Sequence, residues 1–166
     1  MKTTRKSAPP SKAQQPDAEV QVASFIQKFD PKTQTLIRSL RKALGKRLPT
    51  ANQLVYDNYN FFVIGYCTTE RPPDCILSIA AAANGVGLSF YYGATLPDPH
   101  HLLLGDGRQN RFIRLESNAA LARPEVDTLI VAAAAQAKTP LPKTGQGQLI
   151  IRSISKKQRP RRKAAK

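Results

Sequence analysis

Residues 96–115, LPDPHHLLLGDGRQNRFIRL, contain both histidines of the chain and hold its densest set of side chains that could do chemistry. His100 and His101 could bind a metal together with Asp98 or Asp106. Neighbouring histidines on a helical turn, however, point about 100° apart and rarely share one ion. The sequence therefore predicts no metal site in this segment.

Three arginines of this segment, Arg108, Arg111 and Arg114, form a candidate anion pocket. The GDG sequence beside them is not a phosphate loop, because it lacks the GxxxxGK[ST] pattern and does not open a long helix. A second interpretation needs no ligand: Asp98 caps a single helical turn over residues 100–104, and Gly105 ends that turn. Both interpretations are kept as expectations.

Signatures of catalysis are absent from the sequence. No HExxH or GxSxG motif occurs, and the adjacent histidines leave one location for a Ser-His-Asp or Cys-His arrangement. Cys67 and Cys75 lie in apolar segments and are expected to be buried thiols that face each other across a hairpin. We therefore expect a protein that is not an enzyme, with no catalytic residues and no cofactor.

The positive charge is concentrated at the two ends of the chain. Of the net +15, residues 1–17 carry +3 (four basic, one acidic) and residues 143–166 carry +9 (nine basic, none acidic). Residues 18–142 are left with +3 (thirteen basic, ten acidic), so the body is nearly balanced. The pI of about 10.3 is a property of the ends.

The C-terminal sequence SKKQRPRRKAAK gives the clearest functional signal. It is expected to be a flexible polycation that binds nucleic acid or another polyanion weakly, with no sequence preference and with strong salt dependence. A solubilising tail is the alternative interpretation. The residues expected to contact the polyanion are Lys156, Lys157, Arg159, Arg161, Arg162 and Lys163.

Hydrophobic periodicity predicts an α+β fold. Helices are expected from residue 18 to 29, from 31 to about 44 and from 123 to 138, with a short one after residue 48. Strands are expected over 61–67, 75–83, 86–92 and 111–115, with an edge strand over 149–155. The Asn-Gly pair at 84 and 85 predicts a hairpin. The expected architecture is an antiparallel sheet of three to five strands with helices packed on one face.

The ends are expected to be disordered. We predict a disordered basic arm over residues 1–17, a folded domain over 18–142, and a linker with a disordered basic tail over 143–166. The N-terminus has no hydrophobic stretch typical of a secretory signal, and no apolar run is long enough to cross a bilayer. A cytoplasmic protein without a membrane partner is expected.

Several segments together resemble the YdhG-like domain family, a group of small and mostly uncharacterised bacterial domains. They are SLRKALGKRLP, LSFYYG, LPDPHHLLLG (96–105) and RFIRL, and SISKKQRPRR resembles a tail found on some members. The resemblance covers roughly residues 20–138 and implies the fold above. It implies less about function, since one branch is known as a frataxin-like intracellular iron chaperone and most members have no assigned activity.

The iron function is weakened at one place in this sequence. Members commonly carry an acidic residue ahead of the tyrosine-containing turn, where Asn52 and Gln53 stand here. Charged oxygen ligands hold iron best, so these amides are a departure. The leading expectation is a non-enzymatic binding or accessory module whose basic ends dock on nucleic acid or another polyanion. The alternatives are an iron chaperone, with iron as its cargo, and a sensor of a small anionic ligand.

Overall fold

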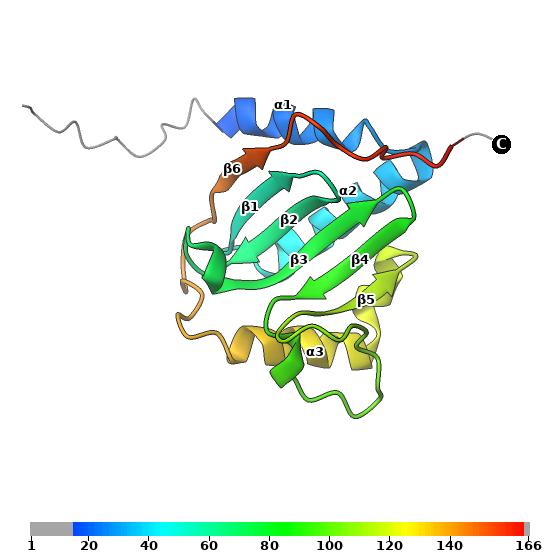
Figure 1. Ribbon diagram of the computed structural model, residues 1–166. Helices are drawn as coiled ribbons and strands as arrows, with labels where there is room; N and C mark the ends of the chain where they lie inside the picture. The colour runs from blue at the N-terminus through cyan, green and yellow to red at the C-terminus, as the bar shows by residue number, and fades with distance from the viewer. Residues whose placement is uncertain (1–14, 165–166) are drawn as a thin grey trace, which may run out of the picture.

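The computed structural model describes residues 15–164, which fold as one mixed sheet and three α-helices (Figure 1). The sheet order is β5-β4-β3-β2-β1-β6. The helices are α1 (Gln15–Ile26), α2 (Pro31–Arg47) and α3 (Pro124–Ala135). The strands are β1 (Asn52–Asp57), β2 (Phe62–Cys67), β3 (Cys75–Ala82), β4 (Gly85–Phe90), β5 (Arg111–Leu115) and β6 (Leu149–Ile154).

The α+β class is confirmed, but the predicted sheet is wrong in two respects. It has six strands instead of three to five, and it is mixed, because β6 pairs parallel with β1. The extra strand is β1, in a segment read from sequence as a short helix. Leu54 and Tyr56 point to one side of the sheet, while Val55 and Asp57 point to the other, which is the two-residue period of a strand.

Local signals place the helices as expected. The side chain of Asp30 accepts a hydrogen bond from the Thr33 amide at 2.8 Å, and Pro31 follows at the first helical position of α2. Pro124 has the same role at the start of α3. The predicted hairpin is also present, but its turn is shifted by one residue. Ala83 and Asn84 form the turn, and Gly85, whose φ of 139° favours glycine, begins β4 opposite Ala82.

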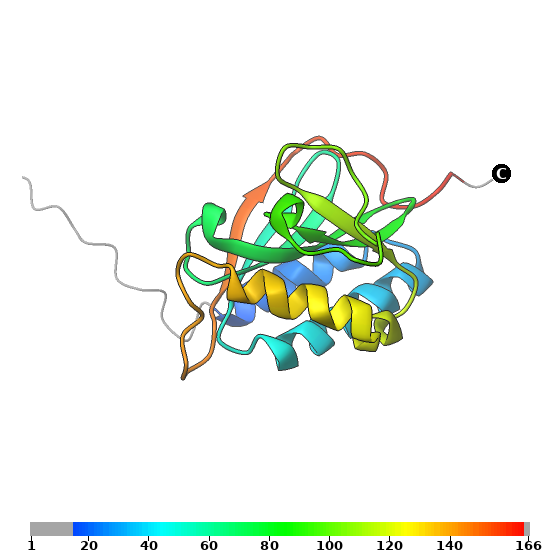
Figure 2. The ribbon, with the colours of Figure 1, turned by 90° about the horizontal axis from the view of Figure 1, so that it is seen from below.

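All three helices lie on the same face of the sheet, so its two faces differ (Figure 2). We call the face under the helices the covered face. Its strand residues include Ile64, Leu77, Ile79 and Leu88, which are fully buried. The other face, the open face, is seen from the front in Figure 1 and has no helix over it.

The predicted disordered tail is corrected for residues 155–164, here called the C-terminal segment. Its backbone follows β6 past the end of β1, with the Ser155 amide 2.9 Å from the Asp57 carbonyl and the Arg159 amide 2.8 Å from the Tyr59 carbonyl. The side chain of Arg161 is buried. Low hydrophobicity predicted disorder, but an ion pair and hydrogen bonds order this segment instead of apolar burial.

Other boundaries of the predicted domains shift as well. The expected edge strand within 143–166 is present as β6. Residues 1–14 of the predicted N-terminal arm lie outside the described residues, whereas residues 15–17 already belong to α1. Within residues 15–164, no helix is long and apolar enough to cross a membrane.

Candidate functional site

Small side chains form a floor at the centre of the open face. Ser78 of β3 is paired directly with Ser89 of β4, and Ala80 is paired with Gly87. Directly paired residues point to the same side of a sheet, so these four lie together. The surface is therefore lower here than at the strands on either side.

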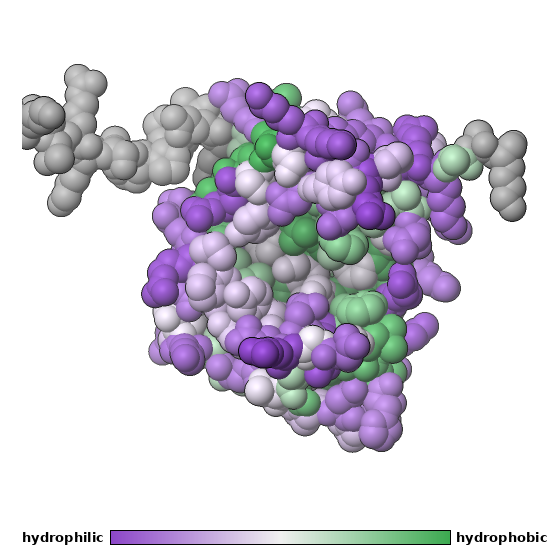
Figure 3. All heavy atoms as spheres, viewed as in Figure 1, coloured by the Kyte–Doolittle hydropathy of each residue, from purple (hydrophilic) through white to green (hydrophobic). Residues whose placement is uncertain are grey.

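Larger residues stand around this floor. Phe112 and Arg114 of β5 pair with Ser89 and Gly87, and Phe61 lies on the opposite side, just before β2. They enclose a hollow of about 460 Å³, which we call the sheet hollow. Figure 3 shows it as a pale and green depression ringed by hydrophilic residues. Its lining consists of Phe61, Val63, Ser78, Ala80, Asn84, Gly85, Val86, Gly87, Ser89, Asn110, Phe112 and Arg114.

The walls of the sheet hollow combine aromatic rings with one cation. The guanidinium of Arg114 lies over the Phe112 ring at 5.9 Å from its centroid, and 47% of the Phe61 residue is exposed to solvent. The Ser89 hydroxyl donates to the Asn110 side-chain oxygen at 2.7 Å. No acidic residue is among the described residues of the lining. The hollow thus offers flat apolar contacts, amide groups and one positive charge.

A buried thiol pair closes the open face at one end. Cys67 and Cys75 are free and buried, and they face each other across β2 and β3 as expected. Hydrogen bonds from the Cys67 and Ser78 side chains outweigh burial and lower the pKa of Cys75. The same hydrogen bond between the two thiols raises the pKa of Cys67, and burial raises it further. A Cβ on Gly65 would lie 3.2 Å from the Cys75 sulfur, so little room is left beside the pair.

The C-terminal segment is tied down by a buried carboxylate. Asp57, fully buried at the end of β1, accepts a hydrogen bond from Lys28 Nζ at 2.6 Å and one from Arg161 Nη2 at 2.9 Å. Arg161 Nη2 also donates to the Asn58 carbonyl at 2.6 Å, and Gln158 donates to the Asp57 carbonyl at 2.9 Å. Burial raises the pKa of Asp57, but the hydrogen bonds from Lys28, Arg161 and Gln158 outweigh it, so the net pKa is lowered.

The ordered segment forms the basic wall of a second hollow. The guanidinium of Arg159 lies 5.6 Å from the centroid of the Tyr59 ring, and Arg162 Nε donates to the Lys28 carbonyl at 3.2 Å. These residues help to enclose a space of about 720 Å³, which we call the tail hollow. The tail hollow is lined by Tyr59, Asn60, Phe61, Ala82, Ala83, Asn84, Arg159, Pro160, Arg162, Lys163 and Ala164.

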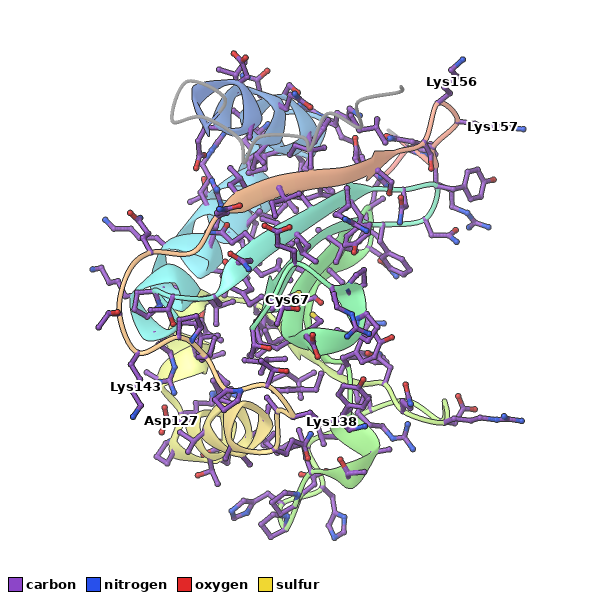
Figure 4. The ribbon with its side chains drawn as sticks, turned by 90° about the vertical axis from the view of Figure 1, so that its left-hand side faces the viewer. Cys67, Asp127, Lys138, Lys143, Lys156 and Lys157 are labelled. Atoms are coloured by element: carbon purple, nitrogen blue, oxygen red, sulfur yellow. The ribbon has the colours of Figure 1, made fainter. Side chains whose placement is uncertain are left out.

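The six cations predicted to contact a polyanion are divided by the structure. Lys156 and Lys157 project into solvent at the turn after β6 (Figure 4). Arg159, Arg162 and Lys163 line the tail hollow. Arg161 forms a buried ion pair with Asp57. It therefore fixes the C-terminal segment and does not belong to a flexible polycation as predicted.

The predicted anion pocket of three arginines is not assembled. Of the three, Arg114 alone lines the sheet hollow. Arg111 pairs with Phe90 on the other side of the sheet, and its guanidinium donates to the carbonyls of Gly107 and Asn110. Arg108 is exposed in the loop before β5.

The loop before β5 supports the interpretation that needs no ligand, with one change. The Asp98 carboxylate accepts hydrogen bonds from the Leu102 and Leu103 amides, each at 2.9 Å, so Asp98 orders this loop without capping a helix. The helical turn over 100–104 does not form. Instead, Leu104 makes a bridge to Phe112, and His101 takes a φ of 53°. Both histidines are exposed and lie outside both hollows.

The side chains of Asn52 and Gln53, the two amides of β1, have structural partners. The Asn52 side-chain oxygen accepts from the Gln148 amide at 2.9 Å, and the Gln53 side-chain oxygen accepts from Arg41 Nε at 2.9 Å. In the described part of the chain, no group of three or more His, Cys, Asp or Glu residues could hold a metal ion.

Sequence reasoning missed the sheet hollow, because its signal depends on the register of β3 against β4. The turn is formed by residues 83 and 84, and counting back from it gives the pairs Ser78–Ser89 and Ala80–Gly87. The predicted turn at residues 84 and 85 would instead place Ala80 opposite Ser89. Small residues at four facing positions, with an aromatic residue and an arginine on the next strand, indicate a depression. A search for catalytic motifs does not detect such a pattern.

Comparison of this chain with protein-family models, with curated proteins and with solved structures found no match, and the resemblance to the YdhG-like family stays a prediction.

Proposed function

We propose that this protein is a non-enzymatic binding module whose sheet hollow takes a small ligand that joins a flat apolar body to an anionic group. The observation that carries the proposal is the lining: a floor of small residues between two phenylalanines, with Arg114 at the rim. Flat rings stack on aromatic walls, and an arginine supplies the counter-charge for a carboxylate, sulfonate or phosphate.

The size and composition of the sheet hollow support the same function. Small-molecule sites commonly have volumes of about 300–1,000 Å³ and apolar walls with a few polar groups that orient the ligand. The sheet hollow has about 460 Å³, with Ser78, Asn84 and Asn110 beside its rings. Neither histidine and neither cysteine lines it, so the proposal assigns it binding and no reaction.

The test uses anilinonaphthalene sulfonate, a fluorescent probe that joins fused rings to one anionic group. We expect saturable binding by the full chain, followed as fluorescence enhancement. Ala80→Leu raises the floor and should abolish binding. Arg114→Gln should weaken binding by about tenfold, because a hydrogen bond to a charged group contributes about 1.5–3 kcal/mol.

Two controls make the test specific. N-phenyl-1-naphthylamine, which lacks the sulfonate, should bind the wild type and Arg114→Gln equally well. Ala135→Leu places the same larger side chain on the exposed side of α3 and should leave binding unchanged. Equal affinity of the wild type, Ala80→Leu and Arg114→Gln for the sulfonate would refute the proposal.

A further inference from the structure

We infer that the sheet hollow and the tail hollow together bind single-stranded nucleic acid, an inference that rests on the proposed function and names its ligand class. The two hollows are continuous, because Phe61 and Asn84 line both. The C-terminal segment runs along the upper margin of the sheet hollow in the view of Figures 1 and 3.

The side chains along this joint surface have one charge sign. Four cations line it, namely Arg114 in the sheet hollow and Arg159, Arg162 and Lys163 in the tail hollow. Among the residues of the described chain that line either hollow, none is acidic. A surface of this kind attracts a ligand that carries several negative charges, whereas a single-charge ligand would need Arg114 alone.

Aromatic side chains are interleaved with these cations. Tyr59 and Phe61 are 43% and 47% exposed, and Phe112 forms the far wall. Unpaired bases stack on such rings regardless of sequence, while arginines and lysines track the backbone phosphates. In a duplex the bases are stacked on each other and are not available to these rings. The combination therefore favours a single strand over a duplex.

The ordering of the C-terminal segment strengthens this surface. The guanidinium of Arg161 forms an ion pair with Asp57 and is not available to a ligand. Because this pair fixes the segment, its neighbours Arg159, Arg162 and Lys163 lie beside Tyr59 and Phe61. A backbone that is ordered before binding loses less conformational entropy when the ligand arrives than the backbone of a flexible tail does. The buried ion pair thus converts a basic tail into part of a shaped site.

The inference is tested by fluorescence anisotropy with a labelled twelve-nucleotide oligothymidylate and with a duplex of the same length. We expect the single strand to bind more tightly. If four cations contact phosphates, the log–log salt slope should be about −2.8, since each contact to a single strand contributes about −0.7. Arg162→Gln combined with Lys163→Gln should reduce the slope to about −1.4 and weaken binding by about tenfold at low salt.

A matched control removes two cations elsewhere. Lys138→Gln combined with Lys143→Gln changes the net charge equally, and neither residue lines the sheet hollow or the tail hollow. Both lie near α3 and the loop that follows it in Figure 4. This variant should bind the oligonucleotide nearly as the wild type does. Thermal melting of each variant shows that it is folded. Equal losses in the two double variants, or equal affinity for duplex and single strand, would overturn the inference.

A competition separates this inference from the proposed function. The oligonucleotide should displace anilinonaphthalene sulfonate from the wild type, while Arg162→Gln with Lys163→Gln should leave the affinity for the sulfonate unchanged. Failure of displacement would overturn the inference and leave the small-ligand function standing. If the sulfonate does not bind, the proposed function fails. Photo-crosslinking of a 5-iodouracil oligonucleotide then decides the inference, which requires crosslinks in the peptide that contains Tyr59 and Phe61.

Discussion

The two faces of the sheet are built from alternate residues of the same strands, yet they have different tasks. Ile79 is fully buried under the helices, and its neighbours Ser78 and Ala80 form the floor of the sheet hollow. The covered face is filled with large side chains, and the open face is hollowed by small ones. Stability should therefore depend on one face, and ligand binding on the other.

The covered face also contains a charge, which sets it apart from a purely apolar core. Asp57 lies on this side of β1 and is fully buried, and its partners come from the turn after α1 and from the C-terminal segment. The covered face thus depends on two kinds of contact, apolar packing at its centre and one ion-pair cluster at its margin.

The largest effect is expected at the ion-pair cluster. Asp57→Ala leaves the buried Arg161 guanidinium without its carboxylate, and removing one partner of a buried pair costs about 3–5 kcal/mol. Urea denaturation should show a loss of this size in the free energy of unfolding. Asp106→Ala, at an exposed loop position, serves as the control. A change below about 1 kcal/mol for Asp57→Ala would show that the cluster contributes little.

The direct comparison of the two faces uses neighbouring residues of β3. Ile79→Ala should lower the free energy of unfolding by about 2–5 kcal/mol, because it leaves a cavity in the covered face. Ser78→Ala on the open face should change it by no more than about 0.5 kcal/mol. Both are measured by urea denaturation. Similar losses for the two variants would contradict the division of tasks between the faces.

The smallest effect is a pH dependence from Asp57. Its pKa is lowered in the folded protein, so its stabilising contribution is present above the unfolded aspartate pKa of about 3.9 and is lost as the pH falls through the lower folded value. The free energy of unfolding should decrease as the pH falls below about 4. Asp57→Asn should show a smaller decrease in the free energy of unfolding over the same pH range. Parallel plots of this free energy against pH for the wild type and Asp57→Asn would contradict the role given to Asp57. Asp30, whose pKa is also lowered by its bond to the Thr33 amide, contributes equally to both curves.

Sequence reasoning located most of the elements, because their signals are local. The cap at Asp30, the proline at 124 and the hairpin turn that contains Asn84 each act within a few residues. The strand β1 was misread, since the sequence before the tyrosine turn has no strong two-residue alternation of polar and apolar types. Its partner β6 comes from the far end of the chain, and no local pattern predicts a parallel pairing over that separation.

The candidate site was harder to predict, for a related reason. Composition correctly placed the positive charge at the ends of the chain, but it could not show that Asp57 would hold Arg161. The three arginines around β5 looked like one pocket, although strand alternation puts Arg111 and Arg114 on opposite faces. The sequence shows which residue types are present. Whether two residues lie on the same surface depends on strand register and on pairing between distant segments.

The pairing of β6 with β1 also has a consequence for the order in which the chain folds. Asp57 and Arg161 are 104 positions apart in the sequence. Bringing them together from the unfolded chain closes a long loop, and the conformational entropy lost in closing it is compensated only after the ion pair has formed. The β3–β4 hairpin closes over two residues and has a much smaller entropy cost. We therefore expect this margin of the sheet to be assembled late, with β1 until then an unpaired edge to which another chain could attach.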